Sequence, residues 1–198
     1  MQNFKYVELA RPLLEKYQEI LLTWQKKVNL ISNSTINDIW NRHILDSAQL
    51  YPLIPEYSKS LIDVGSGAGF PGLVIAILNA VNKGPLTQIT LVDSDMKKSL
   101  FLQEVCRKLD LKVNVLCQRM EKVEGIADVI TARAVAPVAD LLKLVDKNVS
   151  RETLLLFLKG QNVENELQNL PKCYMIQQKV SISDNSGRIV MIRKDSNE

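Results

Sequence analysis

The spacing of hydrophobic and polar positions divides this chain into a helical start and a longer alternating part. Over Tyr6–Leu30 apolar residues recur every three or four positions with Lys and Glu between them, which predicts one long amphipathic helix, with Pro12 as a candidate break. The same spacing over Ile36–Leu50 predicts a second helix. We therefore expect residues 1–56 to form a helical cap on one compact unit, residues 57–198.

After residue 57, short apolar runs of strand length alternate with helical patterns. The expected strands are Leu61–Val64, Gln88–Val92, Lys112–Leu116, Ala127–Ala132 and Thr153–Leu158, and the expected helices begin at Leu73 and cover Met96–Leu109, Val138–Val149 and residues 161–170. A hairpin of Met175–Ile182 and Arg188–Arg193, with a turn at residues 184–187, closes the chain. This order predicts an α/β fold with a seven-stranded, mostly parallel sheet and an antiparallel strand at the end.

Glycines are concentrated directly after the first expected strand. Gly65, Gly67, Gly69 and Gly72 follow Asp63 in the string D-x-G-x-G-x-G, and an apolar helical run comes next. One glycine can permit the turn's dihedrals, others let the backbone approach a ligand, and one lets the helix pack on the strand. The G-x-G-x-x-G match that begins at Gly67 is weak evidence alone, and a glycine turn that binds nothing is the plain alternative.

The full string resembles motif I of the Rossmann-like S-adenosylmethionine methyltransferases. That ligand carries a sulfonium and an ammonium and no pyrophosphate, so carboxylates near strand ends suit it. Asp93 ends the second expected strand, 26 residues after Gly67, where an acid accepts hydrogen bonds from a ribose diol. Asp93-Ser94-Asp95 also has the composition of a helix N-cap, and the two roles are compatible.

Composition narrows the class of protein without identifying a ligand. The 198 residues are 46% hydrophobic and 24% charged, ordinary for a globular domain, and a net charge of +3 is compatible with an RNA partner without being evidence for one. Cys106, Cys117 and Cys173 lack metal-ligand spacing and the chain has one histidine, so we expect reduced thiols and no metal site. The sequence shows neither a signal peptide nor an apolar run long enough to span a membrane, and we expect a cytoplasmic protein.

Two further groups of residues are candidates for the site. Arg119, Arg133 and Lys159 follow expected strands, at the rim where such sheets bind ligands. On the second helix the i,i+4 spacing places His43 beside Ser47, and an isolated histidine on a half-apolar helix is more often structural than catalytic.

In combination, these motifs resemble one family over nearly the whole chain. The residues that carry the resemblance are Asn29-Leu30, Arg42-His43-Ile44-Leu45-Asp46-Ser47, the loop Asp63–Gly72, Thr131-Ala132-Arg133-Ala134 with Pro137, and Lys159-Gly160. They look like the ribosomal RNA small-subunit methyltransferase G family, also called glucose-inhibited division protein B. The resemblance implies a bacterial cytoplasmic enzyme that uses S-adenosyl-L-methionine to methylate N7 of one guanine, position 527, in 16S ribosomal RNA.

The resemblance also implies which residues contact the cofactor. The expected cofactor-binding set is Asp63, Gly65, Gly67, Gly69, Phe70, Asp93, Met120, Glu121 and Arg133, with Arg119, Arg133 and Lys159 as candidates for positioning. Arg133 suits the cofactor's carboxylate. The expected partner is 16S ribosomal RNA, within the small subunit or an assembly intermediate, and we expect a monomer with no membrane partner.

The implied chemistry explains how a site poor in histidine could work. N7 of guanine has a free lone pair, so no proton must leave before attack, and catalysis would be mostly proximity and orientation. Three other interpretations share parts of the pattern: a small-molecule methyltransferase with the cap as its lid, a NAD-dependent oxidoreductase, and a non-enzymatic RNA-binding module.

Overall fold

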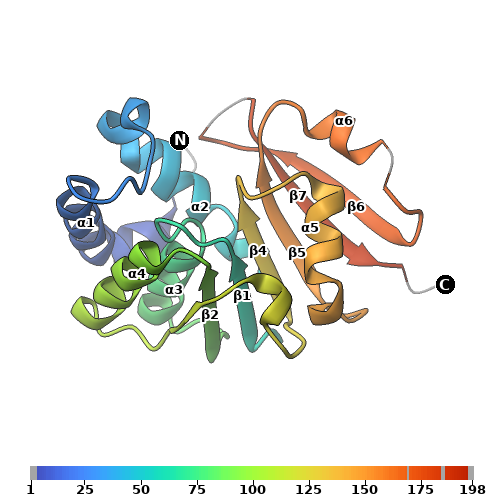
Figure 1. Cartoon of the computed structure of the whole chain (residues 1–198), viewed down its shortest axis with the longest axis horizontal. Coiled ribbons are helices and arrows are strands. Elements are labelled where there is room, and N and C mark those ends of the chain that lie inside the picture. The colour runs from blue at the N-terminus through green and yellow to red at the C-terminus, as the bar shows by residue number, and fades with distance from the viewer. Residues whose placement is uncertain (1–3, 169, 184–185, 196–198) are drawn as a thin grey trace.

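The structure is a computed structural model that describes residues 4–168, 170–183 and 186–195. Within these residues seven strands form one sheet in the order β3-β2-β1-β4-β5-β7-β6, and β7 alone runs antiparallel to both of its neighbours (Figure 1). The strands are β1 (Ser60–Val64), β2 (Gln88–Asp93), β3 (Asn114–Cys117), β4 (Val129–Arg133), β5 (Leu154–Lys159), β6 (Tyr174–Val180) and β7 (Arg188–Lys194). The predicted sheet and its closing hairpin are confirmed.

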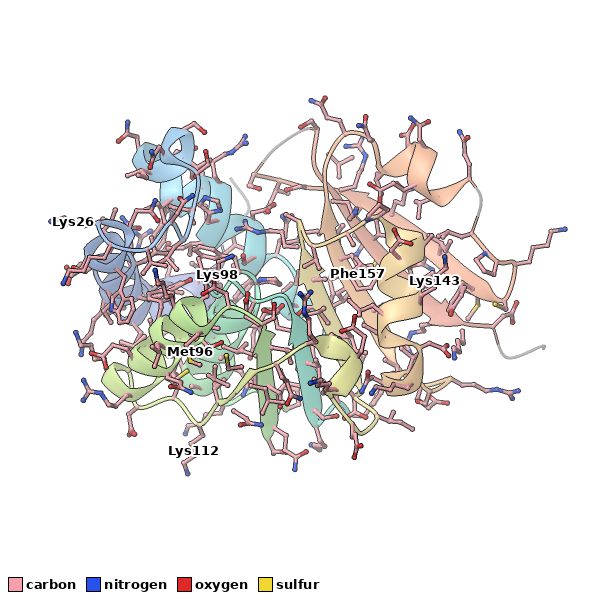
Figure 2. The ribbon with its side chains drawn as sticks, viewed as in Figure 1. Lys26, Met96, Lys98, Lys112, Lys143 and Phe157 are labelled. Atoms are coloured by element: carbon pink, nitrogen blue, oxygen red, sulfur yellow. The ribbon has the colours of Figure 1, made fainter. Side chains whose placement is uncertain are left out.

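The central strands are apolar on both faces because helices cover both sides of the sheet. Alternate residues belong to different cores: Leu61 packs with α3 (Gly72–Asn82) and α4 (Met96–Lys108), whereas Ile62 packs with α5 (Val138–Val145). Phe157 is fully buried in the second core, and Lys143 on the outer side of α5 points into solvent (Figure 2). This two-sided burial explains the unbroken apolar run of β5.

The N-terminal part packs against the sheet through the helices that cover its first face. Tyr17 and Leu21 of α1 (Lys5–Gln25) share one buried cluster with Leu73 and Ile77 of α3. Pro12 lies inside α1 without ending it. The helix stops five residues earlier than predicted because the Gln25 side chain bonds the backbone of residues 30 and 31 and holds the following segment as a loop. The division of the chain near residue 57 stays a prediction.

The second predicted helix is helical in extent but irregular in form. It consists of a 3-10 turn (Asn33–Asp38), a π-helix (Trp40–Leu45) and a short α2 (Asp46–Ala48), followed by a 3-10 turn at Tyr51–Leu53. The prediction of one regular helix is wrong because apolar spacing over so few turns does not distinguish 3-10, α and π geometry. π-turns often occur at functional sites.

Of the later helices, α4, α5 and α6 end before the predicted positions, at Lys108, Val145 and Leu167, whereas α3 begins at Gly72, one residue before the predicted start. Short 3-10 turns occupy Met120–Lys122 and Asp146–Asn148, and α6 covers only Val163–Leu167. Residue 169 of the predicted last helix and residues 184–185 of the predicted turn lie outside the described residues. None of the described helices is both long and apolar enough to cross a membrane.

Candidate functional site

The glycine loop joins β1 to α3 at the carboxyl edge of the sheet. Gly65, Gly67 and Gly69 adopt φ of +62°, +54° and +93°, the left-handed region that glycine enters at little cost. Gly72 serves a different purpose: a Cβ there would lie 2.4 Å from Leu91 Cδ2 and 2.6 Å from Asp63 Oδ2. Two of the three predicted uses of glycine, the turn dihedrals and close packing of helix on strand, are therefore present, and the approach of the backbone to a ligand stays a prediction.

Asp63 lies beneath this loop rather than on its surface. Its side chain is fully buried, and Oδ1 accepts a hydrogen bond from Thr131 Oγ1 at 2.6 Å. Burial raises the pKa of the Asp63 carboxyl to about 6, although the Thr131 bond opposes the shift. From this buried position the Asp63 side chain can support the glycine loop. Its direct contact with a cofactor stays a prediction.

Asp93, at the end of β2, connects the loop to the next helix. Its two carboxylate oxygens accept hydrogen bonds from Gly67 N and Asp95 N, each at 2.8 Å. Asp95 is the N-cap of α4 and accepts from the backbone of residues 97 and 98, as the sequence predicted. Asp93 therefore orders the loop, and its remaining lone pairs can accept hydrogen bonds from a ligand.

A cavity of about 270 Å³ opens between the ends of β1, β2 and β4. Among the residues that line it are five of the predicted site: Gly65, Asp93, Arg119, Met120 and Glu121. Met120 is buried in the cavity wall, while Arg119 is exposed at its rim. Such a pocket, with one carboxylate and an apolar wall, suits the ribose and base of a nucleoside.

Two of the predicted cofactor residues, Phe70 and Arg133, lie together at a second centre, the ring of Phe70. This ring is buried, the His43 ring stacks on it at 4.9 Å between centroids, and the Arg133 guanidinium lies 4.8 Å from its centroid. Tyr17 packs against it and donates its hydroxyl to the Ala68 carbonyl. Phe70 thus supports Arg133 and His43 from within the core.

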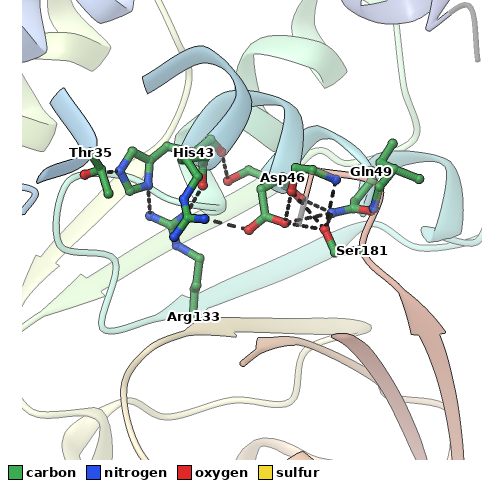
Figure 3. A network of polar contacts seen from close by, with 10 residues as sticks. Thr35, His43, Asp46, Gln49, Arg133 and Ser181 are labelled. Atoms are coloured by element: carbon green, nitrogen blue, oxygen red, sulfur yellow. Dashed lines mark hydrogen bonds and ion pairs between the residues drawn. The ribbon is translucent and has the colours of Figure 1, made fainter. Parts of the chain in front are cut away.

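Arg133 is the hub of a polar network that joins the N-terminal helical segments to the sheet (Figure 3). Its Nη2 donates to His43 Nδ1 at 2.8 Å, its Nη1 donates to the carbonyl of Arg42 at 3.3 Å, and Nη1 lies 3.8 Å from Asp46 Oδ2. Asp46 Oδ1 in turn accepts from Gln49, Ser181 and Ser183. The network therefore ties β4 to the N-terminal helices and to the end of β6.

His43 is held neutral by this network. Arginine can only donate, so Nδ1 is an acceptor and Nε2 carries the proton, which it donates to Thr35 Oγ1 at 2.9 Å. Burial and the nearby positive charge of Arg133 lower the pKa of His43 to about 4. A structural role for His43, favoured by the sequence, agrees with this geometry.

A second cavity, of about 360 Å³, adjoins the first at Ala134, which lines both cavities. The residues that line it include Arg42, His43 and Asp46 from the N-terminal helical segments, Arg133 from β4 and Lys159 from β5. The structure thus places two positioning candidates, Arg133 and Lys159, at this cavity and the third, Arg119, at the first.

Sequence reasoning missed Glu166, which also lines the second cavity and pairs with Lys159 at 2.7 Å. Its only sequence signal is an acid in the short helix after the Lys159-Gly160 motif. In the part of the chain that the structure describes, no cluster of His, Cys, Asp and Glu could hold a metal ion.

Solved structures define the class of protein to which this fold belongs. Magnesium protoporphyrin IX methyltransferase from Synechocystis with bound S-adenosylmethionine superposes with a TM-score of 0.64 at 13% identity, covering 90% of this chain and 97% of that one. A putative methyltransferase from Escherichia coli gives a TM-score of 0.58 at 15% identity, covering 84% of this chain and 89% of that one. The fold is the Rossmann-like one of the S-adenosylmethionine methyltransferases.

Sequence comparison narrows the class to one family. The family profile described as rRNA small subunit methyltransferase G matches residues 10–189. Proteins of that name from Paramagnetospirillum magneticum and a Jannaschia species are 40% and 41% identical, covering 95% and 91% of this chain and 92% and 86% of theirs. The chain belongs to the rRNA small subunit methyltransferase G family.

Proposed function

We propose that this chain transfers the methyl group of S-adenosyl-L-methionine to N7 of a guanine in 16S ribosomal RNA. The observation that carries the proposal is the pair of cavities that meet at Ala134. One has the loop and the carboxylate of Asp93 that suit a nucleoside, and the other can receive an acceptor base at the same edge of the sheet. Family membership supplies the class of substrate.

The residues present fit the cofactor. Asp93 has free acceptor capacity for a ribose diol, and Met120 and the backbone near Gly65 line the space beside it. Arg133 lines the second cavity, next to the shared residue Ala134, and its cation suits a carboxylate. The bound cofactor supplies an already activated methyl group. The protein then has to hold donor and acceptor in line, which can lower the barrier by roughly 7–11 kcal/mol.

The transfer itself needs no proton acceptor. The N7 lone pair forms a bond to the methyl carbon while the carbon–sulfur bond breaks and its electron pair stays on sulfur. The guanine ring gains one positive charge, so the charge lost by the sulfonium reappears on the base. Two acid–base candidates of the described residues are engaged elsewhere: His43 is held by Arg133 and Thr35, and Asp63 is buried under the loop.

Mapping methylated nucleotides tests the proposal directly. Small subunits and free 16S RNA from cells lacking the protein are incubated with it and labelled cofactor, and the RNA is scanned for 7-methylguanine. Label at one guanine N7 is the expected result, and comparing the two substrates shows whether the assembled subunit or free RNA is used. Label only in small metabolites would replace the proposal with a small-molecule methyltransferase. Stabilisation by NAD and not by S-adenosylhomocysteine would indicate an oxidoreductase.

The pH dependence of the chemical step tests the mechanism. With the pKa of His43 lowered to about 4, this histidine is neutral throughout the neutral range, and the Asp63 carboxyl, at about 6, is ionised above it. Single-turnover methylation should therefore be nearly flat between about pH 7 and 8.5, where a general base of higher pKa would give a tenfold slope per unit. An acid limb in this range that disappears in His43→Asn would show that N7 is not the nucleophile.

Asp93→Ala should raise the dissociation constant of the cofactor by one to two orders of magnitude, because hydrogen bonds to a charged acceptor contribute about 1.5–3 kcal/mol. The variant also frees Gly67 N and Asp95 N from their shared acceptor. Asp95→Ala is the matched control, since it removes the α4 cap and leaves the cavity carboxylate in place. Calorimetry with S-adenosylhomocysteine measures both, and equal weakening in the two variants would assign the effect to the helix cap.

A further inference from the structure

One ion pair in the second cavity plays no part in the mechanism so far. Lys159, the last residue of β5, and Glu166 of α6 pair through Nζ and Oε2 at 2.7 Å, with 10% and 24% of their side chains exposed. Lys159 Nζ also donates to the Ala136 carbonyl at 2.7 Å, and Glu166 Oε2 also accepts from Val138 N at 2.9 Å. These bonds fix both groups at the cavity wall.

After these bonds are made, Lys159 and Glu166 each keep one hydrogen-bonding group that a ligand can use. Lys159 has three N–H donors, of which two are used, and Oε1 of Glu166 has no hydrogen bond to any residue that the structure describes. Both side chains line the 360 Å³ cavity together with Arg133 and Ala134, and Ala134 also lines the first cavity, so the pair faces the space that adjoins the cofactor cavity. A base that enters this cavity to be methylated therefore meets one hydrogen-bond donor, on Lys159, and one hydrogen-bond acceptor, on Glu166, side by side.

We propose that this pair reads the Watson–Crick edge of the target guanine, with Lys159 donating to O6 and Glu166 Oε1 accepting from N1–H and the 2-amino group. The inference rests on the proposed function. Along that edge guanine presents one hydrogen-bond acceptor, O6, next to two donors, N1–H and the 2-amino group, and this order complements Lys159 and Glu166. Adenine presents a donor, its 6-amino group, and an acceptor, N1, at the first two of these positions, so it would not pair with them. N7 lies on the other edge of the ring and stays free, which a bidentate contact to O6 and N7 would not allow.

The charges of the pair also suit the transfer. Methylation at N7 makes the ring cationic and its N1–H more acidic, so a hydrogen bond from N1–H to a carboxylate strengthens as the reaction proceeds. Lys159 alone would repel the positive charge that develops on the base, but Glu166 Oε2, 2.7 Å from Lys159 Nζ, neutralises the charge of Lys159. Glu166 is thus a specificity residue that also favours the transition state.

Glu166→Gln tests the assignment because it keeps the shape and an oxygen for Val138 N but loses the charge. Single-turnover rates are measured on small subunits reconstituted with guanine or inosine at the target, since inosine lacks only the 2-amino group. The wild type should favour guanine about tenfold, as expected for one specific base contact. In Glu166→Gln the guanine rate should fall at least about tenfold and the preference should shrink to within about twofold of unity. Glu164→Gln, the same change at an exposed position of α6, should match the wild type.

A second substrate keeps the test independent of how the variant folds. A target of 1-methylguanine removes the N1–H donor, and the wild type should lose at least about tenfold on it. Full activity on 1-methylguanine, or an unchanged guanine-to-inosine ratio in folded Glu166→Gln, would overturn the assignment and leave Glu166 as a cap for α5. Absence of wild-type transfer to the guanine target itself would instead overturn the proposed function on which the assignment rests.

Discussion

Arg133→Lys is expected to lower methyl transfer by about 100-fold or more, the largest effect of any single substitution at this site. The guanidinium is packed over the Phe70 ring and donates at once to His43 Nδ1 and to the Arg42 carbonyl. An ammonium keeps the charge but does not reproduce a planar fork of donors, so it cannot serve these partners and a cofactor carboxylate together. We therefore expect both weaker cofactor binding and weaker packing of the N-terminal helical segments against β4.

Measuring the free energy of unfolding separates the loss of packing in Arg133→Lys from the loss of cofactor binding. Breaking a buried ion pair by removing one partner costs about 3–5 kcal/mol, and a smaller loss is expected here because Lys keeps the charge and Asp46 is partly exposed. Urea unfolding should therefore show a loss of about 1–3 kcal/mol, alongside weaker binding of S-adenosylhomocysteine by calorimetry. Arg119→Lys, at the exposed rim of the first cavity, should change neither stability nor cofactor affinity by a comparable amount. Normal cofactor binding by folded Arg133→Lys would remove Arg133 from the cofactor site.

The sheet and the glycine loop could be predicted because their signals are local. Strand length, apolar runs and turn residues at residues 60–72 specify the strand, the loop and the start of α3, and the structure has positive φ at three of the four glycines. Asp93 could be predicted as a site residue because it stands where a strand ends and a helix begins, and both signals lie in the residues next to it in the sequence.

The network around Arg133 could not be predicted because its members are distant in the chain. Its members come from the N-terminal helical segments (His43 and Asp46), from β4 (Arg133) and from the segment after β6 (Ser181), and only packing brings them together. Asp46 and Gln49 are close in the sequence, but their shared partner Ser181 lies more than 130 residues away. Glu166 is hidden for the same reason: its role depends on Lys159 and Val138 on other elements.

Gly67→Ala is expected to raise the dissociation constant of the cofactor at least tenfold while the protein stays folded. Gly67 has φ of +54°, where an L-residue costs roughly 1–2 kcal/mol, and its N–H donates to Asp93. A Cβ at this position meets nothing closer than 3.7 Å, so the substitution strains the backbone without a clash. Gly69→Ala is less informative, since its Cβ would lie 2.4 Å from Leu73 Cδ1 and would disturb the core.

Gly125→Ala is the matched control for Gly67→Ala. Gly125 also has positive φ, at +91°, a Cβ there meets no atom within 4 Å, and the residue does not line the first cavity. Both variants should lose similar stability in urea unfolding because both place alanine at positive φ. Only Gly67→Ala should bind S-adenosylhomocysteine weakly in calorimetry, because only its backbone is held by the cavity carboxylate of Asp93. Equal affinities of the two variants for S-adenosylhomocysteine would mean that the backbone conformation at Gly67 serves only the fold. Asp93 and Arg133 would then have to hold the cofactor without help from this part of the loop.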